Sequence, residues 1–247
     1  MSISYNPHIS IDCVVFGFDY KELKVLLVER EVWDKKKNKL IKKDLKLPGS
    51  LIRKREELDH AASRVLQEFT GLKNIYLKQF DVFSNPKRIH NAADIQWLHE
   101  HTGIEIEHII SVAYYSLVKL DEASPYENSL KTKAHWVNIN NIPKMIFDHN
   151  EILDKALVAL RNELRTKPVG FELLPKKFTI RQLQNLYEVI LGINLDNRNF
   201  RKKLLKQKYI IPLEEKEQLV NHKPATLYYY DQKLYNKINE GNQFFSI

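Results

Sequence analysis

The segment from Gly49 to Leu72, GSLIRKREELDHAASRVLQEFTGL, constrains the fold more than any other part of the sequence. Between Glu57 and Phe69 its apolar residues recur at helical spacing, which predicts an amphipathic helix. An apolar run from Leu45 to Leu51, interrupted by Pro48-Gly49, comes before this helix and predicts a strand. A strand, a turn and a helix are therefore expected in that order.

Further strands are expected on both sides of this helix. Val, Ile and Phe are enriched in several segments bounded by turn residues, as is typical of strands. These segments are residues 9–18, 23–29, 75–83, 109–118 and 134–138. A polar insert, residues 91–106, contains a predicted short helix. Strands mixed with helices predict an α+β fold arranged as an α/β sandwich.

A second domain is predicted at the C-terminal end. Apolar residues on one side of residues 150–165 predict a helix, with Asp148 or Asn150 as its N-cap, and Pro168 and Gly170 then break the chain. The predicted domains are residues 1–149 and 168–247, joined by a linker helix over residues 150–167.

The C-terminal domain contains two helices with clear start signals. Thr179 and Gln182 form a capping box before a helix that ends at Gly192. Asp196 is a good N-cap for a second helix that continues to Lys208. Short strands at residues 209–211 and 225–230 follow. Two helices and then two strands are the order of a winged helix-turn-helix.

The positive charge is concentrated in this C-terminal domain. The whole chain carries a formal charge of +8. Residues 167–247 contain 14 Lys/Arg and 8 Asp/Glu, or +6, which leaves +2 for the rest. Such an excess favours an acidic partner, first of all nucleic acid, over the alternative of a well-solvated basic surface.

The second helix of this domain is the predicted DNA-recognition helix. Its cations recur every four residues opposite Phe200 and Leu204, which would face the core. Because Arg and Asn bind base edges and Lys and Arg bind phosphates, roles can be assigned by residue type. The predicted base contacts are Arg198 and Asn199, and the predicted phosphate contacts are Arg201, Lys202, Lys206 and, from the wing, Lys223.

Several classes of protein are not expected. The single cysteine, Cys13, allows no intramolecular disulfide and fits the cytoplasm. No signal peptide is expected from the first residues, and no apolar run approaches the ~20 residues of a membrane span. The histidines show no metal-ligand spacing, so neither a metal nor another cofactor is expected.

The segment from Gly49 to Leu72 resembles the Nudix box, G-x5-E-x7-R-E-U-x-E-E-x-G-U, where U is aliphatic. The spacing is kept throughout, with Ser50 in the first Gly place. The residues that follow in register include Glu56, Arg64, Val65, Glu68 and Phe69. This resemblance, over about residues 8–148, implies a Nudix-like α/β/α sandwich with a mixed sheet.

Two positions of this box depart from Nudix hydrolases. The family's helix supplies carboxylates for Mg²⁺ or Mn²⁺, but Val65 and Phe69 replace two of them. Only Glu68 and Glu56 remain, and Arg53 lies in a cationic loop before them. The box therefore predicts a degenerate, non-enzymatic site with no metal. The alternatives are that the helix is purely structural or that the protein is an active pyrophosphatase with an accessory domain.

A Nudix-like domain followed by a winged helix resembles the Nudix-related (NrtR-like) transcriptional regulators. The motifs LKVLLVERE and LDNRNFRKKLL support this resemblance. It implies a homodimer on a palindromic operator in duplex DNA, released by a small effector, with the helix after residue 150 as transmitter. An RNA-binding module is the alternative for the basic domain.

The missing carboxylates favour a resemblance to the arabinose-responsive AraR branch of Bacteroidetes, whose effector is a sugar, L-arabinose. The alternative is an ADP-ribose-responsive regulator of NAD metabolism. The predicted effector contacts are polar residues on or next to strands that frame the usual Nudix pocket: Asp12, Glu29, Lys43, Lys46 and Arg53.

Overall fold

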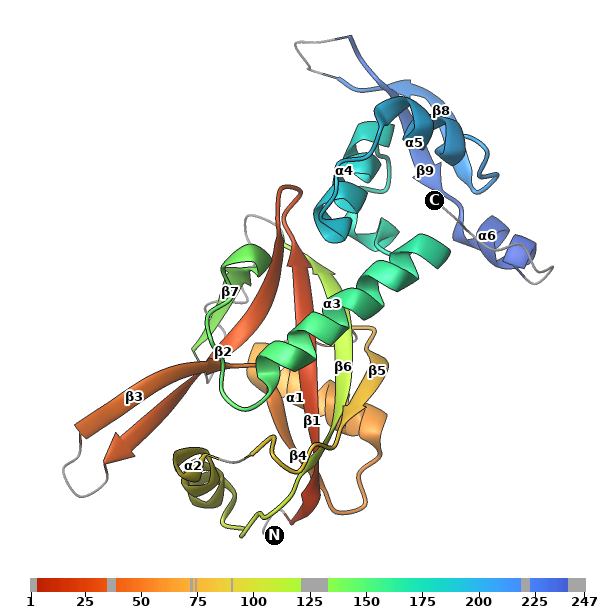
Figure 1. The fold of residues 1–247 in the computed structure, drawn as a ribbon. Helices are drawn as coiled ribbons and strands as arrows, with labels where there is room; N and C mark the ends of the chain where they lie inside the picture. The colour runs from red at the N-terminus through yellow and green to blue at the C-terminus, as the bar shows by residue number, and fades with distance from the viewer. Residues whose placement is uncertain are drawn as a thin grey trace. The chain divides into compact units, whose positions relative to one another are not determined.

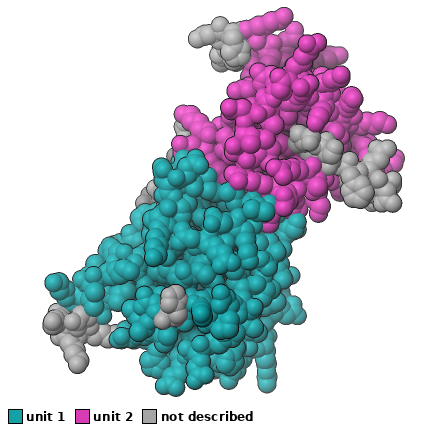
Figure 2. Space-filling model, viewed as in Figure 1, with its two compact units in different colours: residues 1–17, 24–158 teal, residues 18–23, 159–247 magenta. Residues whose placement is uncertain are grey.

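The computed structural model of the chain (Figure 1) describes residues 4–34, 39–71, 73, 75–89, 91–120, 133–218 and 223–239. The chain forms two compact units, shown in different colours in Figure 2. Unit 1 comprises residues 1–17 and 24–158, and unit 2 comprises residues 18–23 and 159–247. The division falls inside α3 (His149–Thr166), within the predicted linker helix. Leu72, the last place of the Nudix-like motif, lies outside the described residues.

A mixed sheet organises unit 1. Among the described residues it has seven strands in the order β3-β2-β1-β6-β5, with β4 paired to β1 and β7 paired to β2. The strands are β1 (Tyr5–Phe18), β2 (Leu23–Asp34), β3 (Lys39–Lys46), β4 (Gly49–Arg53), β5 (Lys78–Phe83), β6 (Ile110–Lys119) and β7 (Ala134–Asn138). The strands expected around the motif helix are therefore present.

Helices cover both faces of this sheet (Figure 1). α1 (Leu58–Thr70) packs on one face, where Ile11, Cys13 and Val15 of β1 contribute to a shared apolar core. Side chains alternate along a strand, so Asp12 points to the other face. There it contacts His149, the first residue of α3. The residues of β1 thus serve the core on one side and a polar site on the other.

The region from Leu45 to Leu51 contains two strands, so the prediction of one strand was wrong. β3 ends at Lys46 and pairs with β2, whereas β4 begins at Gly49 and pairs with β1. Pro48 separates them because it has no N–H for a strand ladder. Its carbonyl accepts a hydrogen bond from the Cys13 N–H at 2.8 Å. The chain thus pairs with β2 before Pro48 and with β1 after it.

Unit 2 contains the predicted helix pair and wing. The elements are α4 (Ile180–Leu191), α5 (Asn197–Leu204), β8 (Ile210–Lys216), β9 (Thr226–Tyr230) and a further helix, α6 (Gln232–Asn239). The capping box is confirmed, because the Thr179 hydroxyl accepts from Gln182 N and the Gln182 side chain accepts from Thr179 N. The Asp196 cap is also confirmed, since its carboxylate accepts from Asn199 N at 2.8 Å. α5 ends before the predicted Lys208.

The polar insert and the connections complete the chain. The predicted short helix is α2 (Ala92–Thr102), which begins after Asn91 and ends at Gly103. Among the residues that the structure describes, 3-10 helices lie at Ile139–Asn141 and Phe171–Leu173. In the part of the chain that is described, no helix combines the length and the apolar character needed to span a bilayer.

Candidate effector pocket and nucleic-acid interface

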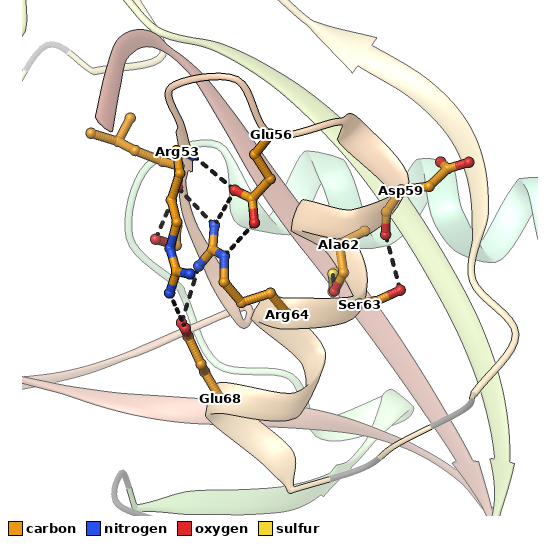
Figure 3. A network of polar contacts seen from close by, with 10 residues as sticks. Arg53, Glu56, Asp59, Ala62, Ser63, Arg64 and Glu68 are labelled. Carbon is orange, nitrogen blue, oxygen red and sulfur yellow. Dashed lines mark hydrogen bonds and ion pairs between the residues drawn. The ribbon is translucent and has the colours of Figure 1, made fainter. Parts of the chain in front are cut away.

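An arginine joins the two acidic positions that remain in the Nudix-like motif (Figure 3). Arg64 Nε lies 2.7 Å from Glu56 Oε1, and Arg64 Nη2 lies 2.9 Å from Glu56 Oε2. The third contact of the guanidinium, from Nη1, is with Glu68 Oε2 at 3.1 Å. The hydrogen bonds from Arg64 hold the pKa of the Glu56 carboxyl below its usual value. Glu56 is therefore a carboxylate committed to a fork-like ion pair.

Arg53 closes the same network from β4. Its backbone N–H donates to Glu56 Oε2 at 2.8 Å, and its guanidinium contacts Glu68 Oε1 at 3.0 Å. Arg64 Nη2 also donates to the Leu51 carbonyl at 3.2 Å. Both acidic side chains are thus neutralised by arginines of the protein itself, and the network ties β4 to α1.

The remaining positions of the motif do not suit a divalent metal. Val65 is fully buried in the core of unit 1, and Phe69 packs against that core from the edge. Mg²⁺ needs several oxygen ligands, which neither side chain offers. Among the described residues, no group of three or more His, Cys, Asp or Glu side chains is placed to hold a metal ion. The residues present therefore do not fit the metal that the Nudix family uses.

A pocket of about 520 Å³ lies in unit 1 beside this motif. A volume of roughly 300–1,000 Å³ is usual for pockets that enclose small ligands. Of the predicted effector residues, Asp12, Glu29 and Lys46 line this pocket. Lys43 and Arg53 are not among its lining residues. Lys43 pairs with Glu29 and Glu31, and Arg53 pairs with Glu68.

The carboxylate of Asp12 forms the polar floor of the pocket. It accepts a hydrogen bond from the Ser111 hydroxyl and lies 3.5 Å from Arg88 Nη2 and 3.5 Å from His149 Nε2. Burial by itself raises the pKa of Asp12, but His149, which is protonated only in acid, together with Arg88 and Ser111 outweighs burial and lowers it. A side chain at Gly49 would clash with the Asp12 carboxylate, so only glycine allows this close approach.

His149 is a neutral member of this cluster. Its Nδ1 accepts a hydrogen bond from the Leu47 N–H at 2.9 Å, which leaves the proton on Nε2, facing Asp12. Burial lowers the pKa of His149 to about 4. The histidine therefore holds the start of α3 against the β3–β4 connection without carrying a charge at neutral pH.

Two buried arginines were not identified from the sequence. Arg88 makes two hydrogen bonds of 2.8 Å with the carboxylate of Asp148, the residue before α3, whose carbonyl accepts from Ile152 N at 3.0 Å. Asn150, the other candidate cap, instead accepts from Met145 N and donates to the Pro143 carbonyl. Arg88 lies in a loop, and its partner is far away in the sequence, so no local pattern could have indicated this pair.

The second buried arginine, Arg30, is held by aromatic rings and carboxylates. It forms ion pairs with Asp44 and Asp94, and its guanidinium lies 5.3 Å from the centre of the Trp97 ring and 5.9 Å from that of Phe147. Through Asp94 and Trp97 it connects α2 to β2. Trp97 and Phe147 also line the pocket. In the sequence Arg30 stands between Glu29 and Glu31, so no local pattern distinguished it as a buried residue.

In unit 2, the predicted DNA-binding residues are all exposed. They are Arg198, Asn199, Arg201, Lys202, Lys206 and Lys223. On the opposite side of α5, Phe200 and Leu204 are buried, and Phe200 packs edge-to-face on Tyr187. In the described part of the chain, no ion pair involves a cation of α5. The helix thus presents a positive face that carboxylates of unit 2 do not neutralise.

A buried glutamine that the sequence did not reveal fixes the turn before α5. Gln184 Nε2 donates to the Leu195 carbonyl at 2.9 Å and to Asn197 Oδ1 at 2.6 Å. It also contacts Glu188, whose carboxylate accepts from Leu195 N at 3.0 Å. Because these bonds connect α4 to the first turn of α5, they set the direction in which the exposed face of α5 points.

Comparisons with known proteins agree with this arrangement. Residues 170–230 match the family model of the NrtR DNA-binding winged helix domain. Over 229 residues, covering 90% of this chain and 82% of the relative, the chain is 27% identical to the ADPR responsive transcriptional repressor NtrR of Acinetobacter baylyi. It is also 26% identical, over 60% of this chain and 72% of the relative, to an ADP-ribose pyrophosphatase of Methanocaldococcus jannaschii.

A solved structure confirms the predicted fold. The crystal structure of Shewanella oneidensis NrtR complexed with a 27mer DNA has a TM-score of 0.68 and 24% sequence identity. The match covers 90% of this chain and 93% of that chain. The chain therefore consists of a Nudix-like α/β unit with a mixed sheet and a C-terminal winged helix unit.

The buried, neutral His149 predicts a loss of stability in mild acid. Its pKa is lower in the folded state, about 4, than in the unfolded state, about 6.5. Only the unfolded state gains this proton as the pH falls from 6.5 to 4, so folding loses roughly 2–3 kcal/mol over that window. The free energy of unfolding is measured by urea titration with tryptophan fluorescence as the signal, because all three tryptophans lie in unit 1.

His149→Asn is the matched variant, since its side-chain oxygen can still accept from the Leu47 N–H. We expect a flatter pH profile for this variant. The control is His60→Asn, at an exposed position of α1, which keeps the wild-type profile. If wild type and His149→Asn lost equal unfolding free energy between pH 6.5 and pH 4, the pH dependence would not come from His149.

Proposed function

We propose that this chain, an NrtR-like Nudix-fold transcriptional regulator, represses transcription by binding an operator in duplex DNA and leaves that operator when a small effector binds in unit 1. The observation that carries the proposal is the exposed cationic face of α5 on a winged helix unit. The similarity to a repressor over 90% of the chain supports it independently.

The positions of the α5 side chains suggest how DNA is held. Arg198 and Asn199 lie in the first turn, which enters the major groove in helix-turn-helix proteins, and contact base edges. Arg201 and Lys202 lie further along α5, Lys206 follows its end, and all three contact phosphates. Lys223, which precedes β9, contacts the backbone from the wing. The protein acts as a homodimer on a palindromic site, because two such helices give the specificity that one short helix lacks.

The proposed effector is ADP-ribose. The A. baylyi relative is described as ADPR responsive, and this favours the ADP-ribose alternative over L-arabinose, for which the comparisons give no support. The pocket chemistry agrees, because Lys46 supplies a cation for a diphosphate, and Arg30 and Arg88, each held by carboxylates, line the same pocket. Trp97 and Phe147 supply aromatic surface for a base. A single pentose would use neither feature fully.

The effector acts on DNA binding through α3. The pocket is lined by Phe147 and by His149, the first residue of α3, and this helix continues into unit 2. An effector can change DNA affinity only by stabilising one conformation more than another. Contacts with His149 and its neighbours give the effector direct access to the start of the transmitter helix.

The Nudix-like unit binds its effector without cleaving it. Metal-assisted hydrolysis needs free carboxylates, but Glu56 and Glu68 are both held by Arg64 and Arg53. Val65 and Phe69 offer only carbon atoms. The catalytic function of the motif is replaced by a structural one, in which the arginine network braces α1 against β4.

The DNA-binding role of α5 is tested by Arg198→Ala. We expect operator affinity to fall about 10- to 100-fold, because each base contact by an arginine contributes about 1–3 kcal/mol. The operator is obtained by selection from genomic DNA, and affinity is measured by fluorescence anisotropy. Lys176→Ala removes an exposed cation of the same unit outside α5 and serves as the control. Unchanged affinity in Arg198→Ala would rule out this recognition helix.

The effector is tested by release of the wild-type protein from the selected operator. We expect ADP-ribose to lower operator affinity, since it binds the state that is not competent for DNA. L-Arabinose and ribose, added at the same concentrations in gel-shift titrations, should leave binding unchanged. Release by L-arabinose alone would show that the effector is a sugar and that the ADP-ribose assignment is wrong.

Hydrolysis is tested with ADP-ribose and Mg²⁺ or Mn²⁺, using a coupled phosphatase and phosphate detection. We expect no turnover above the background without protein, because the two remaining carboxylates are paired with arginines. An active Nudix pyrophosphatase assayed in parallel is the positive control. Turnover that depends on Glu56 would establish the enzyme alternative.

A further inference from the structure

Lys46 is an unusual cation of the effector pocket. The residue is only 6% exposed, yet it lines the pocket next to Gly49 and Phe69. Its Nζ donates to the carbonyls of Leu47 and Gly49, both at 3.2 Å. An ammonium group has three protons to donate. Within the described residues, the third has no oxygen acceptor, and Nζ lies 4.7 Å from the centre of the Phe69 ring.

The other cations that line the pocket already have carboxylate partners. Arg30 pairs with Asp44 and Asp94, and Arg88 pairs with Asp148 and Asp12. Lys133 pairs with Glu31. Lys46 alone among these lining cations makes no ion pair within the described part of the chain. A buried charge without a partner is costly, so an anion that entered the pocket would gain most by binding there.

The surroundings of Phe69 explain why this place suits an anion. In the Nudix-like motif, Phe69 occupies a position where a carboxylate is usual, and a carboxylate at this position would pair with Lys46 and occupy it. The phenyl ring instead offers Lys46 a cation–π contact, which stabilises the ammonium without neutralising its charge. The replacement therefore keeps a positive charge available at the pocket wall.

We propose that Lys46 is the built-in cation of the effector pocket and binds a phosphoryl or other anionic group of the effector directly, in place of a metal ion. This inference rests on the proposed effector pocket, and it specifies the chemistry of its ligand: an anionic compound, not a neutral sugar. The structure also shows how the charge is tolerated without ligand, through two carbonyls and one aromatic ring.

The titration behaviour of Lys46 is consistent with this role. Burial lowers its pKa to about 8, against the opposing effect of Asp12 on β1, while Arg30 on β2 lowers it further. The other titratable groups nearby are neutral: burial raises the pKa of the Cys13 thiol and lowers that of His149 at the start of α3. An anion in contact with Nζ favours the charged form, so binding at pH 8 should take up a proton.

The test compares Lys46→Met and Lys46→Gln with Lys39→Met, a control at an exposed lysine on the same strand. Isothermal titration calorimetry measures binding of ADP-ribose, inorganic pyrophosphate, adenosine and L-arabinose to each protein. We expect both Lys46 variants to bind the two anions about 10- to 100-fold more weakly, as for a lost hydrogen bond to a charged group. Lys39→Met should bind as wild type does.

Proton uptake provides a readout that a structural role of Lys46 would not change. Titrations of wild type with anions at pH 8, in two buffers of different ionisation enthalpy, should show uptake that disappears in Lys46→Met and Lys46→Gln. Urea unfolding of both variants identifies any that fail to fold, and the folded variant decides the result. Wild-type anion affinity in a folded Lys46 variant would overturn the proposal.

The results also separate this inference from the proposed function. If wild type binds L-arabinose and neither anion, the role of Lys46 is refuted, while an effector-controlled repressor still stands. If the anions bind through Lys46 but leave operator affinity unchanged, the anion site stands and the effector assignment fails. Anion binding that depends on Lys46 and releases the operator supports both.

Discussion

The burial of one carboxylate, that of Asp12, shapes the pocket of the Nudix-like unit. A buried carboxylate must be paired and hydrogen-bonded, and Asp12 draws in Ser111 from β6, Arg88 from the loop after β5 and His149 from α3. These groups come from separate parts of the chain, so the pocket floor exists only when the sheet and α3 are assembled. Gly49 completes it by leaving room for the carboxylate.

The acidic side chains of the Nudix-like motif are also paired with cations, and here the pairing joins β4 to α1. Arg64 holds Glu56 in a bidentate contact and reaches Glu68, and Arg53 closes the network. The acidic residues retained from the motif thus brace β4 and α1. The proposed charge for ligand binding comes from Lys46, which lies against Phe69 of the motif. The motif therefore contributes a scaffold and an aromatic wall to the proposed effector site.

In the winged helix unit, polar contacts orient α5. Gln184 and Glu188 hold the turn before α5, while Tyr187 and Phe200 form the apolar contact beneath it. The cations on the outer face of α5 are left to the solvent or to a polyanion. Like charges on one helix face repel, and a DNA backbone relieves that repulsion. A rigid support and an unneutralised face together give the unit its proposed role.

The sequence alone determined the order of the two units, most of their strands, both caps of the helix pair and the exposed cations of α5. These follow from periodicity, capping residues and charge, all of which act over a few residues. It also identified Asp12, Glu29 and Lys46 as polar residues near the pocket. Only the tertiary structure decided that Arg30, Arg88 and His149 join them, that Lys43 and Arg53 do not, and that two strands flank Pro48. Those outcomes depend on pairing between residues distant in sequence, which local patterns do not encode.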